Sequence, residues 1–317
     1  MSEERILTPE SVQSEIKRTR HKWERILYFL TILAGLAMFV FIVHAAFGED
    51  GAMDQIKAKL AEGNVTESTP YFSSMIMIVI TLSSLIVGFG AIILFAFSYL
   101  FQLYKQYADD MSYSVRVSEK NYPEIYEYVK EFTRLLGWKK EPEVYIQQMN
   151  GEINAYSCWV PGKSFVHLNA EIVDLGYLEH KDFETIAFVM AHEFGHLYLH
   201  HVQIHYNLWT VFANFIPVVG QKFINPLLQR AREYSADRVA QALTDGKAQV
   251  ECMMLCAIGR HIYKYTDVDD YMAWINRDHN IIERFARFLT NMVTNHPIMP
   301  FRTAAILDEE KKSGRLL

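Results

Sequence analysis

Two long stretches without charged side chains constrain this sequence more than any other feature. Residues 26–48 contain no Asp, Glu, Lys or Arg over 23 residues, and residues 71–104 contain none over 34 residues. A membrane-spanning helix needs about 20 mostly apolar residues, so each stretch is long enough to cross a bilayer. A buried helix of a soluble protein rarely remains uncharged over such lengths. We therefore expect two transmembrane helices near the N-terminus.

The second stretch is longer than a single crossing requires. Its 34 residues would extend about 50 Å as a helix, whereas the hydrocarbon core is about 30 Å thick. We expect this helix to leave the bilayer near Tyr99–Tyr104 and to continue into the next domain. Tyrosine suits such a boundary, because its ring and its hydroxyl prefer different surroundings.

Basic residues in the flanking segments predict the orientation of the two spans. Residues 1–25 carry six Lys or Arg, the loop 49–70 carries two together with five acids, and residues 105–124 carry three. Short segments rich in Lys and Arg remain in the cytoplasm. We therefore expect an integral, multi-pass membrane protein, in a bacterial inner membrane, with the loop 49–70 outside. Both termini and the domain 105–317 would be cytoplasmic.

Composition excludes several classes of function. Acidic residues outnumber basic residues, 37 against 31, so nucleic acid is not an expected partner. The three cysteines form no CxxC pair, which disfavours both a disulfide framework and a cysteine zinc site.

Hydrophobic periodicity predicts the fold class of the domain 105–317. Strands are expected over 142–149, 153–160 and 164–168, with Asn150-Gly151 as a tight turn between the first two. The expected helices cover 123–136, 183–201, 226–244, 248–264, 280–293 and 301–311. This pattern predicts a mostly helical α+β domain with a small β-sheet.

The run His192-Glu193-Phe194-Gly195-His196 is the main chemical signal. Residues four apart on a helix face the same side, so both imidazoles can bind one metal ion. Glu193 lies beside them and can act as the general base toward metal-activated water. The preceding residues 186–191 are all apolar, which predicts a buried helix. A buried charge such as Glu193 needs a partner, and a metal ion is one.

A catalytic zinc site needs a third protein ligand and one open position. The metzincin pattern is excluded, because it requires Gly and His where this chain has Leu199 and Val202. His200, His201 and His205 follow closely, but three ligands on one straight helix cannot surround an ion. We interpret these three histidines as structural or as lying near the membrane interface.

Glu233 is the better candidate for the third ligand. It lies on the expected helix 226–244, four residues before Asp237 and on the same face. One carboxylate can bind zinc while the other accepts a hydrogen bond from a ligand histidine and so defines its tautomer. Taken alone, the same two acids would also fit an ordinary solvent-exposed helix face.

These motifs together resemble the gluzincin membrane metallopeptidases, which include the bacterial HtpX-type heat-shock proteases and the CAAX prenyl endopeptidases. Four passages of the sequence resemble the family. They are His-Glu-x-x-His at 192–196, the later Glu-x-x-x-Asp at 233–237, Asn154-Ala155 in the preceding strand, and His296-Pro297 followed by Arg302. The likeness covers about residues 120–305, and the pair of N-terminal spans is closer to the HtpX type. The resemblance implies a zincin-type metalloprotease domain.

The resemblance also implies roles for individual residues. By this resemblance, one Zn²⁺ per chain would be bound by His192, His196 and Glu233, and Glu193 would be the general base. Asp237 would hold a ligand from behind, and His296 would stabilise the oxyanion. Arg302 would support His296 or the substrate, and Asn154 and Ala155 would bind the substrate. Apart from the resemblance, the position of the strand 153–160 also suggests that it binds substrate. It can present an unpaired edge that holds an extended peptide through main-chain hydrogen bonds.

A third apolar stretch lies between the two halves of the expected metal site. Because His196 and Glu233 must reach one ion, the chain between them must cross the bilayer an even number of times. Only 36 residues intervene, and two crossings need about 40. We therefore predict no crossing, with residues 206–220 forming a buried or membrane-skimming helical hairpin beside the site.

The leading hypothesis is an integral-membrane zinc endopeptidase that acts on polypeptides, with membrane proteins as the expected substrates. A role in membrane-protein quality control is implied by the HtpX resemblance alone. One alternative is a CAAX-type prenyl-protein protease, although two spans cannot build the larger membrane chamber of those relatives. The other is a membrane-anchored, non-catalytic zinc-binding adaptor, which would have no need of Glu193. The expected partners are polypeptide substrates and the lipid bilayer, and the sequence does not specify an oligomeric state.

Overall fold

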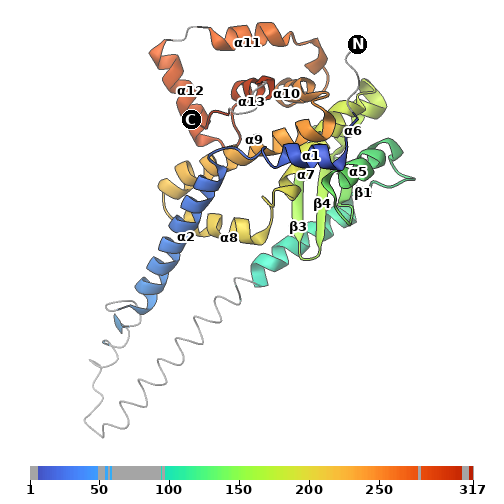
Figure 1. The fold of residues 1–317 in the computed structure, drawn as a ribbon. Coiled ribbons are helices and arrows are strands. Elements are labelled where there is room, and N and C mark those ends of the chain that lie inside the picture. Colours follow the sequence, from blue (N-terminus) through green and yellow to red (C-terminus); the bar gives the residue numbers. More distant parts are fainter. Residues whose placement is uncertain are drawn as a thin grey trace, which may run out of the picture.

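The computed structural model describes residues 6–48, 54, 55, 58, 94, 97–277, 280–308 and 314–316. Over these residues the chain is mostly helical and surrounds a small mixed sheet, which confirms the expected mostly helical α+β class (Figure 1). The strands are β1 (Val115–Arg116), β2 (Glu143–Gln147), β3 (Ala155–Val160) and β4 (Lys163–Asn169). The helices are α1 (Pro9–Ile16), α2 (Glu24–Phe47), α5 (Pro123–Leu136), α6 (Ala170–Asp174), α7 (Phe183–Tyr198), α8 (Ile204–Asn214), α9 (Asn225–Thr244), α10 (Gln249–Ile258), α11 (Val268–Asn276), α12 (Ile281–Val293) and α13 (Met299–Leu307).

The four strands are ordered β1-β2-β4-β3. β2 and β4 are parallel, whereas β3 and β4 are antiparallel. The expected turn forms, with positive φ at Asn150 (56°) and Gly151 (93°), but β4 separates the two strands that flank it. The reason is burial: residues 165–169 of β4 are buried at every position. A strand that is covered on both faces belongs in the interior of a sheet.

The sheet lies between two helical layers. Val144 and Val166 face the main core, which includes side chains of α5 and α7. Tyr145 and Phe165 face the opposite way, where Tyr107 from a helix over 97–113 packs against them. This helix continues the second uncharged stretch past Tyr104 into the domain, as expected. The remainder of that predicted span and nearly all of the loop 49–70 lie outside the described residues, so the two-span arrangement stays a prediction.

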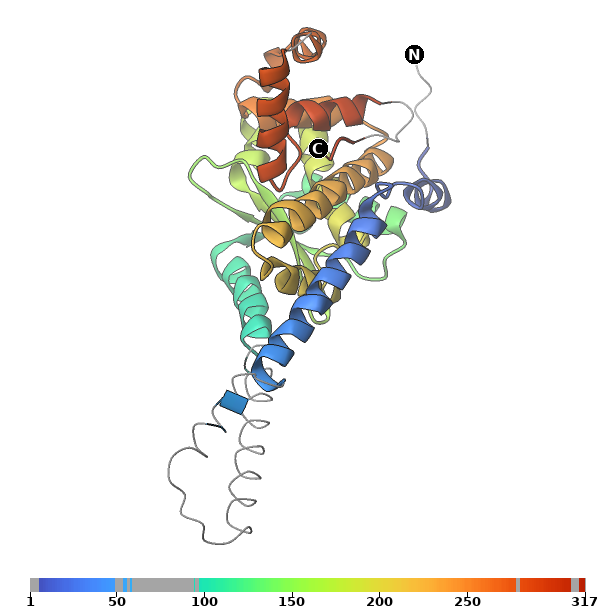
Figure 2. The same ribbon diagram turned by 90° about the vertical axis from the view of Figure 1, so that its left-hand side faces the viewer.

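Helix α2 projects away from the rest of the domain (Figure 2). The most apolar 18-residue window of its segment Glu24–His44 has a mean hydropathy of 2.7, and no other helix in the described ranges is long and apolar enough to cross a membrane. Large apolar side chains such as Phe29, Val40 and Phe41 are exposed along it. The apolar helix expected over 26–48 is therefore present, while its insertion into a bilayer remains a prediction.

Helix α8 packs along α2. The rings of Tyr28 and Tyr206 stack with their centroids 4.4 Å apart, and those of Phe39 and Phe212 meet edge to face at 5.6 Å. After α8 the chain turns back through a π-helical segment, Val219–Ile224, into α9. The segment predicted as a hairpin, 206–220, is thus largely helical. It lies between the two helices that carry the metal-binding motifs.

Three expected helices end earlier than their patterns predicted. The helix expected over 301–311 is α13, which ends at Leu307 because Asp308 is extended. α7 ends at Tyr198 rather than at residue 201, because His200 adopts a left-handed conformation with φ of 66°. α10 ends at Ile258, where Gly259 has φ of 87°, so the helix expected over 248–264 is interrupted. The following α11 was not predicted.

Candidate metal centre

Helices α7 and α9 pack closely enough to bring the two sequence motifs together. Gly195, inside the first motif, faces α9, and a Cβ atom there would lie 3.1 Å from the Ala236 carbonyl oxygen. Such a contact is tighter than a side chain ordinarily accepts, so glycine permits this approach. The glycine of the motif therefore has a packing role that sets the spacing between the helices.

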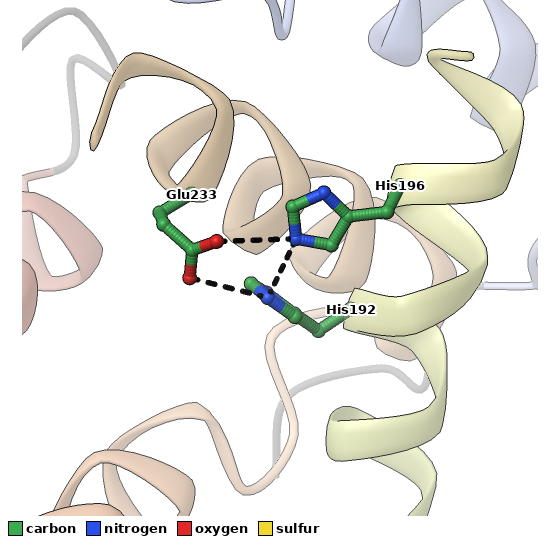
Figure 3. A group of neighbouring side chains, drawn as sticks. All are labelled: His192, His196 and Glu233. Atoms are coloured by element: carbon green, nitrogen blue, oxygen red, sulfur yellow. Dashed lines mark hydrogen bonds and ion pairs between the residues drawn. The ribbon is translucent and has the colours of Figure 1, made fainter. Parts of the chain in front are cut away.

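Three ligand atoms converge between these helices (Figure 3). His192 Nε2 lies 3.1 Å from His196 Nε2, and His196 Nε2 lies 3.3 Å from Glu233 Oε1. His192 Nε2 lies 3.6 Å from Glu233 Oε2. All three ligand atoms lie within 4.8 Å of one another, so a single ion can reach them all. The structure thus brings together the three residues that the sequence predicted as ligands.

Behind His192 lies a buried carboxylate. Asp237 Oδ1 accepts a hydrogen bond from His192 Nδ1 over 2.8 Å, which leaves Nε2 as the nitrogen that can give up its proton to a metal ion. Asp237 in turn accepts two hydrogen bonds from Arg302, over 2.7 Å and 2.6 Å. Burial alone would raise the pKa of Asp237, but the charge of Arg302 and these hydrogen bonds lower it to about 2. Asp237 is therefore an ionised partner that orients the imidazole.

The local charges fit a cation at the point where the ligand atoms meet. Burial would raise the pKa of Glu233, yet hydrogen bonds from three histidines hold it well below its usual value. Burial would lower the pKa of His192, but Asp237 and Glu233 raise it to about 10. Both shifts show that the two carboxylates favour positive charge here. Two imidazoles and one carboxylate form a ligand set that zinc accepts, with a fourth position left open.

Glu193 lies next to this ligand set on α7 and is only 8% exposed. No side chain among the described residues donates a hydrogen bond to its carboxylate or pairs with it. Its neighbours His192 and Glu233 are both engaged, so the free carboxylate of Glu193 is distinctive. A carboxylate without a structural partner is available for proton transfer.

His296 and Arg302 differ in where the structure places them. His296 Nδ1 lies 2.9 Å from Glu233 Oε2, and its side chain is 72% exposed at the open side of the site. Arg302 is buried and pairs with Asp237, on the far side of His192. Arg302 Nη1 also lies 3.8 Å from Glu233 Oε2, the oxygen that His296 contacts. Its expected support of His296 or the substrate therefore stays a prediction, alongside its contact with Asp237.

Asn154 and Ala155 lie where the edge strand β3 begins. Ala155 pairs with Leu168 of β4, and the other edge of β3 faces no strand in the described part of the chain. The Asn154 side-chain oxygen accepts a hydrogen bond from the Ala155 amide over 3.0 Å. β3 also packs against α7, which carries the metal-binding motif. An unpaired edge beside the site is thus present, while its use by a substrate stays a prediction.

Sequence reasoning interpreted His201 as structural but did not connect it, or Glu24, to the site. His201 Nδ1 lies 2.9 Å from His196 Nδ1, and His201 Nε2 lies 3.2 Å from Glu24 Oε1. Burial lowers the pKa of His201 to about 3, so its ring is neutral. The signal available in the sequence was the position of His201 five residues after His196. Nothing in the sequence linked Glu24, 177 residues away, to either histidine.

The fold and the site define a metallopeptidase centre built from two helices, and a comparison with protein families agrees. A model of peptidase family M48 matches residues 119–310, which is more than half of the chain. The chain belongs to this family, and the resemblance to the HtpX and CAAX-type peptidases is confirmed at that level. Membership indicates a metallopeptidase, which is a hydrolase. No curated protein and no solved structure matches the chain.

Proposed function

We propose that this chain is a membrane-anchored, zinc-dependent endopeptidase that hydrolyses polypeptides at the centre formed by α7 and α9. The observation that carries the proposal is the convergence of His192, His196 and Glu233, with the unpaired carboxylate of Glu193 beside them. A purely structural zinc site would be closed by a fourth protein ligand. The cluster found among the described residues has three.

Each residue of the centre has a distinct task in this proposal. His192, His196 and Glu233 would hold the ion. Zinc at such a site acts as a Lewis acid and lowers the pKa of the water it coordinates to about 7. Glu193 would accept a proton as general base and then deliver it to the leaving amine of the cleaved peptide bond.

The remaining predicted residues would orient the substrate or the ligands. His296 lies at the exposed side of the centre beside Glu233, where we assign it to stabilising the oxyanion. Arg302 would act through Asp237 by holding it against His192. The free edge of β3 would bind the substrate main chain as an added strand, beginning at Asn154 and Ala155.

The membrane part of the proposal is supported by α2. The 21-residue segment Glu24–His44 has only 17% of its most apolar window buried, so in water it would expose a large apolar surface. We propose that α2 and the segment preceding residue 97 insert into the bilayer, with the domain on the cytoplasmic side. Substrates would then be membrane proteins or polypeptides close to the membrane surface, as in protein quality control.

Replacement of the general base tests the proposed activity. In the full-length protein in detergent, Glu193→Gln should retain zinc and reduce the cleavage of casein by at least about 100-fold. The matched control is Glu184→Gln, which removes an exposed carboxylate from the first turn of the same helix and should cleave normally. Cleavage that persists in the Glu193 variant would exclude the mechanism. Zinc binding by a wild-type protein that cleaves nothing would instead favour the adaptor.

A further inference from the structure

His201 links the predicted metal ligand His196 to Glu24, the first residue of α2, which we call the anchor helix. His200, in its left-handed conformation, turns the chain back after α7, so that the His201 amide donates to the His196 carbonyl over 2.9 Å. The two rings then meet at their Nδ1 atoms over 2.9 Å, and His201 Nε2 reaches Glu24 Oε1 over 3.2 Å. His201 and Glu24 are almost fully buried, at 3% and 2% exposed.

The carboxylate end of this chain of contacts determines where each proton lies. Glu24 is paired with Arg20 and also accepts a hydrogen bond from the Ser235 hydroxyl, so it is ionised and can only accept. His201 Nε2 must therefore be the donor to Glu24. In a neutral ring, Nδ1 of His201 is then the acceptor, so His196 must donate from its own Nδ1.

This arrangement of protons determines the state of His196 Nε2, the nitrogen that faces the ligand cluster. With its proton on Nδ1, His196 has an unprotonated Nε2, which is the atom close to His192 and Glu233. This is the tautomer that a metal ligand requires. We propose that Glu24 and His201 are positioning residues that hold His196 in its metal-binding tautomer and orientation, so that the anchor helix completes the metal centre. This inference rests on the proposed function.

The two ligand histidines are supported from different parts of the chain. His192 is held by Asp237, a residue of α9 within the region that matches the family. His196 is held through His201 by Glu24, which lies outside the matched residues 119–310. Ser235 of α9 also donates a hydrogen bond to Glu24, so α9 contacts both supports. A shift of α2 relative to the domain would therefore disturb His196 and leave His192 in place.

We call the hydrogen-bonded series Glu24–His201–His196 the relay. Substitutions at His201 test it in the full-length protein in detergent. His201→Ala removes the acceptor for His196 and should weaken zinc affinity by about 10- to 100-fold, measured by competition with a chromogenic chelator. In His201→Asn the amide oxygen can replace Nδ1 as the acceptor, so most of the affinity should return. The visible absorption of the cobalt(II)-loaded protein should change in the Ala variant and be restored in the Asn variant.

A second pair of variants tests whether Glu24 acts through His201. Glu24→Gln leaves one amide oxygen to serve three donors, so zinc affinity should fall by about 10-fold. The same substitution should have no further effect in a protein that already carries His201→Ala, because the connection is already broken. An undiminished effect of Glu24→Gln in that background would overturn the relay, as would wild-type affinity in His201→Ala.

The chain offers a matched control for simple loss of packing. Asp110 and His167 form another buried carboxylate–imidazole pair, 2.5 Å apart, between the helix over 97–113 and β4. Neither residue contacts a predicted metal ligand. Asp110→Asn should lower stability while zinc affinity remains that of the wild type. Equal losses of affinity in Asp110→Asn and His201→Ala would show that the effect is only structural.

The two proposals can fail separately. Wild-type protein that binds zinc and cleaves polypeptides, together with His201 variants of unchanged affinity, would overturn the relay and leave the proposed function intact. Wild-type protein that binds no zinc would overturn both, since the relay would have no ligand to position.

Discussion

Arg302 donates two hydrogen bonds to Asp237, directly behind the predicted metal ligand His192. All three side chains are buried, and Asp237 bridges the other two. Asp237 therefore has two functions: it balances the charge of a buried guanidinium, and it presents an ionised acceptor to the imidazole.

Removal of the Asp237 carboxylate should impair both stability and metal binding. Asp237→Ala leaves Arg302 buried without its partner, which should cost about 3–5 kcal/mol of unfolding free energy. Zinc affinity should fall by about 10- to 100-fold, because His192 loses the acceptor that defines its tautomer. Chemical denaturation and chelator competition measure the two effects.

A double substitution separates these two effects. Asp237→Ala with Arg302→Met removes the unpaired charge, so much of the stability should return while zinc affinity remains low. Full recovery of zinc affinity in the double variant would contradict a direct role of Asp237 behind His192.

Gly195 should be intolerant of larger side chains. Gly195→Val places atoms against Ala236 and Val239, which forces α7 away from α9. Since His196 lies on one helix and Glu233 on the other, their ligand atoms should separate. A displacement of about 1 Å at a catalytic centre can cost about 100-fold in rate, so cleavage should fall by that order.

The control for this substitution is Gly151→Ala, where an added Cβ meets no atom within 4 Å. It should affect only the turn before β3 and leave zinc affinity unchanged. Normal zinc binding by Gly195→Val would show that the close approach of the helices is not required.

Contact between α2 and α8 should depend on Gly35. A Cβ atom at Gly35 would lie 2.8 Å from the Trp209 carbonyl oxygen, so Gly35→Leu should separate the two helices. Small residues allow such close helix contacts in membranes. We expect a loss of about 1–3 kcal/mol, seen as a lower midpoint of thermal unfolding in detergent. Leu36→Ile, at the adjacent exposed position, should unfold as the wild type does.

Stability should depend on pH through His21. Its ring stacks on Tyr234 and lies 3.1 Å from the Gly314 carbonyl oxygen, and burial lowers its pKa from 6.5 to about 4. The unfolded chain therefore takes up a proton near pH 6.5, while the folded protein does so only near pH 4. The free energy of unfolding should fall as the pH decreases through this interval, by about 3 kcal/mol from this residue.

Comparison with His21→Phe isolates this contribution. The variant keeps an aromatic ring but cannot bind the proton, so its stability should change less between pH 6.5 and 4. Identical pH dependence in the two proteins would show that His21 does not cause the loss.

Local sequence patterns were sufficient for the elements that carry the chemistry. The strands β2, β3 and β4 and the helices α7 and α9 lie within a few residues of their predicted bounds. The spacing of His192 and His196, and of Glu233 and Asp237, required only helical geometry. The order of the strands could not be predicted in this way, because it depends on which strand is covered on both faces.

Local patterns in the sequence were thus enough to predict an apolar helix before a mostly helical α+β domain, and ligands at helical spacing. The tertiary structure alone decided which groups meet across large separations. Arg302 contacts Asp237, 65 residues away, and Glu24 contacts His201, 177 residues away. The physical reason is that periodicity reports the side on which a residue lies, whereas hydrogen bonds between distant residues depend on how the elements pack.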